Sequence, residues 1–386
     1  MSKRRIYLDH AAGTPVAPEV AKAMEGCIKD VFGNPSSIHR EGVSAKTALK
    51  DAREKVAKVL SVKADEIVFT GSGSESINLA ILGTVRASKI KNPHIITTAI
   101  EHKAVLETAH KLEKEGVSIT YLPVDINGLV KVADVLRAVK PETVLVSIMY
   151  ANNEIGTVEP IIKIGSILKE KFPNVYFHTD ACQAGGMLPL SVERMRVDLL
   201  TLNGSKIYGP KGVGALFVRR GTKIEPIIYG GGQEHKLRAG TENVVGIVGF
   251  ALALELAEKL RKKESKRLTL LRDYLIKRIL TEIPDTELNG HPKERLPGNV
   301  NISFKGIPGE KLVLYLDAKG VAVGTGSACE TANPKPSHVI LALGKSKESA
   351  LSTIRFSLGR STTKKDLDYV MSILPGIVEK LRKAPM

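Results

Sequence analysis

The stretch EIVFTGSGSES, residues 66–76, decides the fold, because it reads as a strand, a turn and the start of a helix in direct succession. The apolar run 66–70 is followed by glycines and serines, and a helical pattern begins near Ser74 and Glu75. A strand that passes through a short turn into a helix is the repeating unit of a parallel sheet covered by helices.

The same alternation continues through the first two thirds of the chain. Further strands are predicted over residues 94–100, 118–124, 143–150, 175–181 and 199–203, mostly separated by helical stretches such as 133–140 and 164–172. This order predicts an α/β fold with a largely parallel sheet between layers of helices. The runs 214–220 and 225–231 follow, and they predict an antiparallel pair at the edge of the sheet.

A long helical pattern from Val244 to about Ile283 separates this region from the rest. After it come three short strand-like runs, 298–304, 321–326 and 353–359, interleaved with helices. We therefore expect a large domain of residues 15–258 and a small α+β domain of residues 1–14 and 259–386, with the long helix as a bridge.

Composition narrows the class of protein. With 43% hydrophobic and 25% charged residues, the chain is an ordinary globular sequence. No apolar run approaches the roughly 20 residues that span a bilayer, and the first ten residues contain no signal-peptide hydrophobic region, so a cytoplasmic protein without membrane contact is expected. Three scattered cysteines without a CxxC pair make neither a disulfide framework nor a zinc site.

The formal net charge of +16 favours acidic partners such as phosphorylated cofactors, nucleotides or acidic proteins. Nucleic acid would be the other partner of a basic chain. However, aromatic residues make up only 4% of the sequence and tryptophan is absent, whereas single-stranded nucleic acid is bound by aromatic stacking. Direct nucleic-acid binding is therefore not expected.

Three elements at predicted strand ends suggest a cofactor. The turn 71–76 could bind one phosphate through backbone N–H groups at a helix start, although an ordinary strand-to-helix turn reads the same way. Asp180 ends one strand and could bind a metal or face a protonated ring nitrogen; its neighbours offer few metal ligands. Lys206 follows another strand and could be a surface charge, a nucleic-acid contact or a covalent anchor. Together the three suit pyridoxal phosphate better than a nucleotide.

Three other residues are candidates for chemistry. His102 lies between a strand and a helix, where it could be structural or could stack on an aromatic ring and move protons. Cys329 lies in the polar run 323–338, which favours an accessible, reactive thiol over a buried one. Arg355 interrupts an apolar strand and needs an anion, either a substrate carboxylate or an internal salt bridge.

Seven motifs, taken together, resemble the cysteine desulfurases of the NifS/IscS type, which are class V-like pyridoxal-phosphate enzymes of fold type I. They are FGNPSSIHR (32–40), EHKAVL (101–106), ANNEIG (151–156), HTDACQAGG (178–186), NGSKIYGPKG (203–212), RAGTEN (238–243) and GSACETANPKPSHV (326–339). The likeness runs from YLDHAAGTP (7–15) to RFSLGRSTT (355–363). It implies a seven-stranded, mostly parallel sheet, a small domain that carries the catalytic cysteine, and a homodimer.

The resemblance also implies site residues. Lys206 would be the covalent anchor of pyridoxal 5'-phosphate, and the catalytic residues would be Cys329, Lys206 and His102. The remaining cofactor contacts would come from Gly73, Ser74, Asn153, Asp180, Gln183, Asn203, Ser205 and, from a second subunit, the partner's Thr241. The substrate would be held by Arg355, Asn34 and Asn153. Ser205 departs from the family, where the residue before the lysine is commonly histidine.

The implied reaction takes sulfur from L-cysteine, releases L-alanine and leaves a persulfide on Cys329. Acceptors would be an iron–sulfur scaffold protein of the IscU type or a tRNA-thiolation enzyme. No resident metal is expected, although Cys329 could be a transient iron–sulfur ligand. An aminotransferase or a selenocysteine lyase would share the lysine, aspartate and histidine, and Cys329 is what separates these alternatives.

Overall fold

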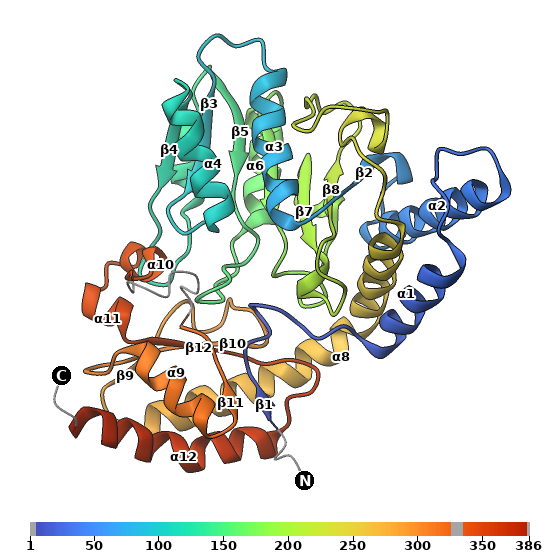
Figure 1. Ribbon diagram of the computed structural model, residues 1–386. Coiled ribbons are helices and arrows are strands. Elements are labelled where there is room, and N and C mark those ends of the chain that lie inside the picture. The colour runs from blue at the N-terminus through green and yellow to red at the C-terminus, as the bar shows by residue number, and fades with distance from the viewer. Residues whose placement is uncertain (1–4, 326–334, 384–386) are drawn as a thin grey trace.

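In the computed structural model, residues 5–325 and 335–383 are described, and they form an upper layered α/β region above a smaller region (Figure 1). The main sheet has seven strands in the spatial order β2 (Ile67–Thr70), β8 (Gly214–Val218), β7 (Leu199–Asn203), β6 (Tyr176–Asp180), β5 (Thr143–Ser147), β3 (His94–Thr98) and β4 (Ser118–Leu122). β8 runs opposite to the other six strands, which share one direction, so the predicted mostly parallel, seven-stranded sheet is confirmed.

The predicted antiparallel edge pair is wrong in two respects. β8 lies between β2 and β7 inside the sheet, and all five of its residues are buried. The second run, 225–231, forms no strand. It contains Pro226, which cannot donate to a ladder, and Gly230 and Gly231, which lack side chains to pack on a sheet.

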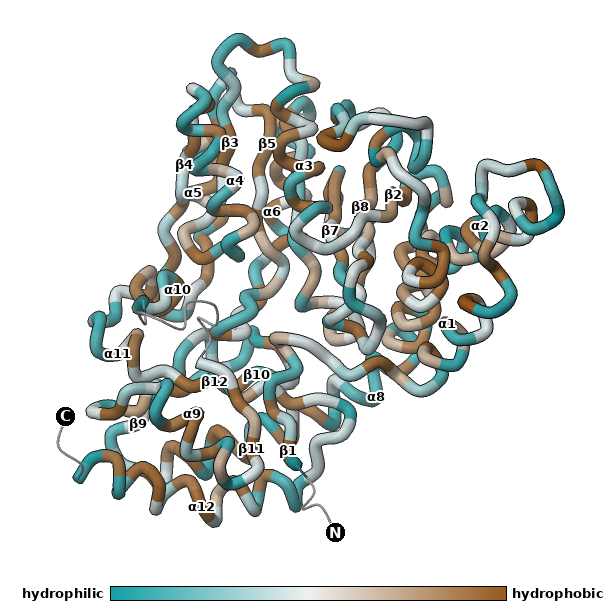
Figure 2. Tube along the Cα trace, in the orientation of Figure 1, coloured by the Kyte–Doolittle hydropathy of each residue, from teal (hydrophilic) through white to brown (hydrophobic). Residues whose placement is uncertain are grey.

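Helices cover both faces of the sheet. They are α1 (Pro18–Asp30), α2 (Arg40–Leu60), α3 (Gly73–Ala87), α4 (Lys103–Lys114), α5 (Val132–Ala138), α6 (Ile161–Lys171) and α7 (Val192–Met195), with short 3-10 turns η1 (Ala64–Glu66), η2 (Gly204–Lys206) and η3 (Glu234–Lys236). Side chains of α3 and α4 pack on one face, and those of α2, α6 and α8 (Val244–Glu282) pack on the other. Figure 2 shows the corresponding apolar colour along the strands and polar colour on the outer loops.

The predicted long helix is present as α8, which has 39 residues. Its first half contributes Phe250 and Leu254 to the core beside the main sheet. Its second half contributes Leu275 and Ile279 to a separate core in the smaller region. Among the described residues, no helix is long and apolar enough to cross a membrane.

The smaller region contains two further sheets. β12 (Thr353–Ser357), β10 (Asn299–Phe304) and β9 (Thr286–Leu288) are antiparallel, while β1 (Ile6–Tyr7) pairs with β11 (Val321–Ala322) in parallel. The run 321–326 is thus a shorter strand than predicted, and β9 was not predicted. Helices α9 (Gly309–Ala318), α10 (His338–Ala342), α11 (Lys347–Leu351) and α12 (Lys364–Lys383) complete the region. We propose that the two separate cores belong to the two domains divided at residues 15 and 258.

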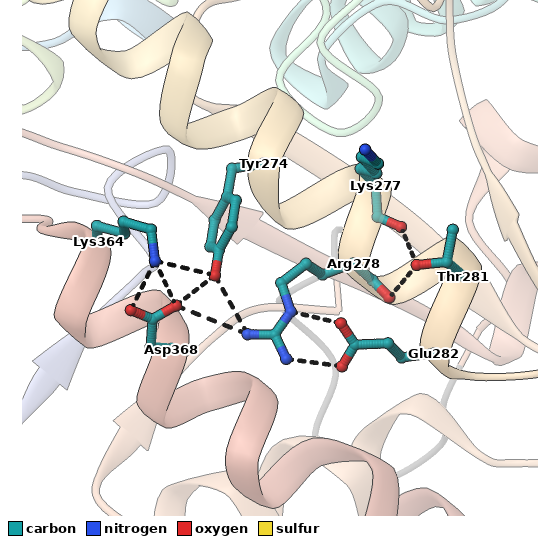
Figure 3. A network of polar contacts seen from close by, with 7 residues as sticks. All are labelled: Tyr274, Lys277, Arg278, Thr281, Glu282, Lys364 and Asp368. Atoms are coloured by element: carbon teal, nitrogen blue, oxygen red, sulfur yellow. Dashed lines mark hydrogen bonds and ion pairs between the residues drawn. The ribbon is translucent and has the colours of Figure 1, made fainter.

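A polar network joins α8 to α12 on the surface of the smaller region (Figure 3). The hydroxyl of Tyr274 donates to Asp368, and Lys364 Nζ lies 2.9 Å from the same carboxylate. Arg278, one turn further along α8, lies 3.6 Å from Asp368 and also pairs with Glu282. Exposed ion pairs of this kind contribute little free energy, so the buried apolar contacts beneath them hold α12 in place.

Candidate active site

The candidate site lies at the carboxyl edge of the main sheet. β3, β5, β6 and β7 are parallel neighbours, so the segments that follow them meet at one edge. His102 follows β3, Asn153 follows β5, Asp180 ends β6 and Lys206 follows β7. The topology therefore brings these four predicted residues to one edge, which is where open α/β sheets bind their ligands.

Lys206 is the last residue of the short η2 turn, and the side chain of Asn203 stabilises this turn. The Oδ1 atom of Asn203 accepts hydrogen bonds from the backbone N–H of Ser205, at 3.2 Å, and from its hydroxyl, at 3.3 Å. Lys206 Nζ donates to the carbonyl oxygen of Ala12 at 2.6 Å. Burial lowers the pKa of the Lys206 amine, because desolvation disfavours its charged form. A larger share of the amine is therefore uncharged and nucleophilic at neutral pH.

Asp180 is a buried carboxylate, 8% exposed, at the end of β6. Its Oδ1 atom accepts a 2.9 Å hydrogen bond from the backbone N–H of Cys182. No basic side chain in the described parts of the chain forms an ion pair with it. A buried charge is costly without an opposite charge, and a protonated ring nitrogen would supply that charge to Asp180.

A buried histidine supports this part of the sheet, and the sequence did not single it out. His178, two residues before Asp180, contacts the Ser147 hydroxyl at 2.8 Å and the Thr201 hydroxyl at 3.0 Å on the two neighbouring strands. Burial lowers its pKa to about 4, so the ring is neutral near pH 7. The cationic partner for Asp180 therefore does not come from His178.

The start of α3 lies against the same loops. A Cβ atom added to Gly73 would lie 2.8 Å from Cys182 Sγ and 3.3 Å from Asn203 Cβ, so only glycine fits without displacement. Within residues 5–325 and 335–383, the N–H groups of Gly73 and Ser74 donate no hydrogen bond. Unpaired N–H groups at a helix start bind phosphate well.

The residues present fit pyridoxal phosphate on these observations. The cofactor needs an amine for its aldehyde, an acidic partner for its ring nitrogen and donors for its phosphate. Lys206, Asp180 and the start of α3 supply those groups at one edge of the sheet. The described residues contain no group of three or more His, Cys, Asp or Glu side chains placed to hold a metal ion.

Arg355 lies on β12 with its side chain only 4% exposed. Its Nη2 atom lies 2.8 Å from Asp9 Oδ1, and its Nη1 atom donates to the carbonyl oxygen of Asn153 at 2.9 Å. The internal salt bridge that the sequence left open is thus present. The buried Nε atom has no hydrogen-bond partner among the described residues.

The chain matches the class-V aminotransferase family over residues 6–370. It is 52% identical to the cysteine desulfurase IscS of Dictyoglomus turgidum over 98% of this chain and 96% of the relative. It is 49% identical to the IscS of Methanosarcina thermophila over 98% and 93%. The chain belongs to the IscS/NifS-type cysteine desulfurases. As a member of the class-V aminotransferase family, it depends on pyridoxal phosphate.

Solved structures agree with this membership in the IscS/NifS-type family. A NifS-like protein superposes with a TM-score of 0.92 at 38% identity, covering 98% of this chain and all of that one. DndA from Streptomyces lividans superposes with a TM-score of 0.77 at 36% identity, covering 91% and 99%. The predicted fold of the IscS/NifS type is therefore confirmed.

Some predicted site residues of this IscS/NifS-type chain lie elsewhere. Asn34 is exposed in the connection between α1 and α2, which Figure 1 shows far from the ends of β5, β6 and β7; its side chain accepts from Ser36 N–H at 2.9 Å. Thr241 is exposed just before α8, and no contact joins it to Lys206 in the described chain. Cys329 lies outside the described residues. His102, by contrast, does follow β3 at this edge of the sheet, and its exposed side chain caps α4 by accepting from Ala104 N–H at 3.1 Å.

Two residues beside the site, Asp9 and His10, were not predicted from the sequence. His10 and Gln183 line the same cavity as Lys206, and His10 Nδ1 lies 3.0 Å from the carbonyl oxygen of Ser357. Gln183 had been predicted, but His10 and the salt-bridged Asp9 had not. The motif YLDHAAGTP could have indicated both, because its Asp and His directly follow a strand-like run.

Proposed function

We propose that this chain removes sulfur from L-cysteine, releases L-alanine and leaves a persulfide on Cys329. The observation that carries the proposal is the meeting of Lys206, Asp180 and the start of α3 at one edge of the sheet, in a chain of the IscS/NifS type. An aminotransferase would use the same three elements but would not need a reactive cysteine. Cys329 therefore favours desulfuration over amino transfer.

Each part of the cofactor would have a partner on this chain. Lys206 would bond to the aldehyde, Asp180 would face the ring nitrogen, and His102 would stack on the ring. The other contacts would come from Gly73, Ser74, Asn153, Gln183, Asn203, Ser205 and Thr241 of the partner subunit. When bound, pyridoxal phosphate draws electrons from the α-carbon of the substrate, so that its proton can leave and the carbon–sulfur bond weakens.

The remaining groups bind the substrate and move protons. Arg355 would hold the carboxylate of L-cysteine, since its buried Nε–H has no partner among the described residues. The Lys206 amine could accept a proton, because burial lowers its pKa and so leaves a larger share of it uncharged. His102 would serve as a second acid or base at the mouth of the site.

The sulfur step is balanced without a further reagent. The Cys329 thiolate forms a bond to the sulfur of L-cysteine as the carbon–sulfur bond breaks. The bonding electron pair stays on the carbon, which takes a proton and leaves as L-alanine. Cys329 is four residues after Thr325, so at most about 14 Å of extended chain separates the two. Gly324, five residues before Cys329 in the sequence, is hydrogen-bonded to Arg355.

We further propose that the protein is a homodimer in the cytoplasm. Exposed apolar side chains support a second copy near the α1–α2 connection, where Phe32 is 77% and Ile38 is 96% exposed. The persulfide would pass to an iron–sulfur scaffold protein of the IscU type or to a tRNA-thiolation enzyme. The net charge of +16 supports an acidic acceptor.

The test uses the full-length protein loaded with pyridoxal phosphate. With L-cysteine and a thiol reductant, it is expected to release alanine and sulfide in equal amounts. Cys329→Ala should keep the colour of the bound cofactor and lose turnover, with Cys27→Ala as the control because Cys27 is buried at α1. Full turnover by Cys329→Ala would overturn the persulfide role. Transfer of the amino group to a keto acid would favour an aminotransferase.

A further inference from the structure

One hydroxyl group, that of Ser337, makes two hydrogen bonds. Its oxygen accepts from the backbone N–H of Ile340 at 3.2 Å, which caps α10. It also donates to Glu154 Oε2 at 2.5 Å, across 183 positions of sequence. Ser337 is 1% exposed and Glu154 is 4% exposed. The hydrogen bond to Glu154 is not needed to cap α10, so it serves another purpose.

The backbone of Glu154 is held by hydrogen bonds that do not involve Ser337. Its carbonyl oxygen accepts from the side-chain amides of Asn299 and Asn301 on β10, each at 3.0 Å. Its N–H donates to Asn152 Oδ1 at 2.8 Å. Because the backbone of Glu154 is fixed in this way, its side chain starts from a defined position when it meets the Ser337 hydroxyl.

Apolar contacts place α10 on the same edge of the sheet. Val339, Ile340 and Leu343 form one buried cluster with Ile100 and Met149, which follow β3 and β5. In addition, His338 Nε2 lies 2.9 Å from the Glu101 carbonyl oxygen, directly before His102. Figure 1 shows α10 beneath β3 and β4, facing the sheet from the smaller region.

The chain on the other side of residues 326–334 is also fixed. Gly324 and Arg355 exchange backbone hydrogen bonds of 3.1 and 2.7 Å. Arg355 Nη1 in turn donates to the carbonyl oxygen of Asn153. The described chain before 326–334 is thus linked to Asn153 through Arg355, and the chain after it contacts the next residue, Glu154, through Ser337.

We propose that the hydrogen bond between Ser337 and Glu154 is a positioning contact for the sulfur-transfer step. The inference rests on the proposed function, because it assigns a role relative to Cys329, eight residues earlier in the chain. Neither residue touches substrate or cofactor in this assignment. The contact fixes where the chain that carries the nucleophile rejoins the site, and errors of about 1 Å in such geometry cost up to about a hundredfold in rate.

The test compares serine caps in the cofactor-loaded, full-length protein. Ser337→Ala removes both hydrogen bonds, whereas Ser337→Thr keeps a hydroxyl group. Ser346→Ala is the matched control, because Ser346 caps α11, a helix of the same five-residue length, by accepting from Ser349 N–H. The readouts are cofactor absorbance, the KM for L-cysteine, and the rate at which the Cys329 peptide gains a sulfur atom, followed by mass spectrometry.

Ser337→Ala is expected to slow persulfide formation by about tenfold to a hundredfold, with cofactor absorbance and KM within about twofold of wild type. Ser337→Thr should recover most of the rate, and Ser346→Ala should leave it unchanged. If Ser337→Ala does not fold, Ser337→Gly takes its place, since glycine at a cap costs only a few tenths of a kcal/mol.

Two results would overturn the positioning role. One is a persulfide rate for Ser337→Ala equal to that of Ser346→Ala. The other is a loss of cofactor binding together with rate, which would make the contact merely structural. Failure of the proposed function looks different, because the wild-type protein itself would then form no persulfide and no alanine.

Discussion

Arg355 and Asp9 lie 346 positions apart in the sequence, and their side chains form a salt bridge of 2.8 Å beside the candidate substrate site. A Cβ atom added to Gly324 would lie 3.0 Å from the Asp9 carboxylate and 3.2 Å from the Arg355 guanidinium, so a glycine lets the pair approach the chain closely. The salt bridge holds one edge of the guanidinium, and the Nε–H remains without a partner among the described residues.

Arg355→Lys should raise the KM for L-cysteine by about tenfold to a hundredfold, the cost of a charged hydrogen bond. Lysine keeps the charge but loses the flat, forked donor arrangement. Steady-state kinetics measures the effect, and cofactor absorbance should not change. Arg382→Lys on α12 is the control, and an unchanged KM for Arg355→Lys would remove Arg355 from the substrate site.

Glu101 makes the stability of the folded protein depend on pH. Burial raises its pKa to about 8, so the folded protein keeps the carboxyl protonated while the unfolded chain ionises near its usual pKa. Stability is then highest below the unfolded pKa and falls as pH rises from about 5 to 8, by up to about 1.4 kcal/mol per pH unit. Glu101→Gln should flatten this decline in denaturant titrations, because glutamine cannot ionise.

The decline in wild-type stability has other contributors, so the comparison needs a control. Glu159 is also buried with a pKa of about 8, and it is left intact in both proteins. Glu115→Gln, on an exposed residue after α4, should leave the pH profile as in wild type. Parallel profiles for wild type and Glu101→Gln would contradict a buried, protonated Glu101.

Arg53→Ala should destabilise the fold by about 3–5 kcal/mol, because it leaves a buried carboxylate without its partner. Arg53 contacts Glu234 at 2.6 Å and 2.8 Å, and Glu234 also accepts from Phe69 N–H. Glu234 begins three consecutive non-glycine residues with positive φ, a strained turn that this ion pair stabilises.

Lys50→Ala is the control for that measurement, because its exposed pair with Glu54 lies on the same helix. Exposed pairs contribute about 0–1 kcal/mol. The free energies of unfolding of both variants can be read from urea titrations. A loss for Arg53→Ala as small as that for Lys50→Ala would show that the buried pair does not hold the turn.

Most of the sheet could be predicted from the sequence because strand and helix periodicities are local. Strands β2 to β7 and the helix α8 each carry their pattern within the segment itself. The place of β8 could not be predicted, because strand pairing is decided by residues far apart in sequence. Gly214 at the start of β8, for example, lies close to the backbone of Ser72, which follows β2, and to the carbonyl oxygen of Leu202 on β7. The three-residue strand β9 is too short to show a period.

Some residues of the candidate site could likewise be predicted from local sequence, and others could not. Asp180 and Lys206 could be predicted because each ends or follows a strand, and parallel topology brings strand ends together. The pairing of Arg355 with Asp9, and that of Ser337 with Glu154, joins residues far apart in sequence, where no local pattern indicates the partner. Asn34 and Thr241 do not join the site within one chain, and a second subunit is the proposed reason for Thr241.

Lys206 is the proposed anchor of pyridoxal phosphate at the edge of this sheet. The most direct measurement is peptide mapping by mass spectrometry after the yellow, cofactor-loaded protein is reduced with borohydride. One pyridoxyl group is expected, attached to the peptide that contains Lys206, and none in Lys206→Ala. A pyridoxyl group on another lysine, or on no peptide at all, would contradict it.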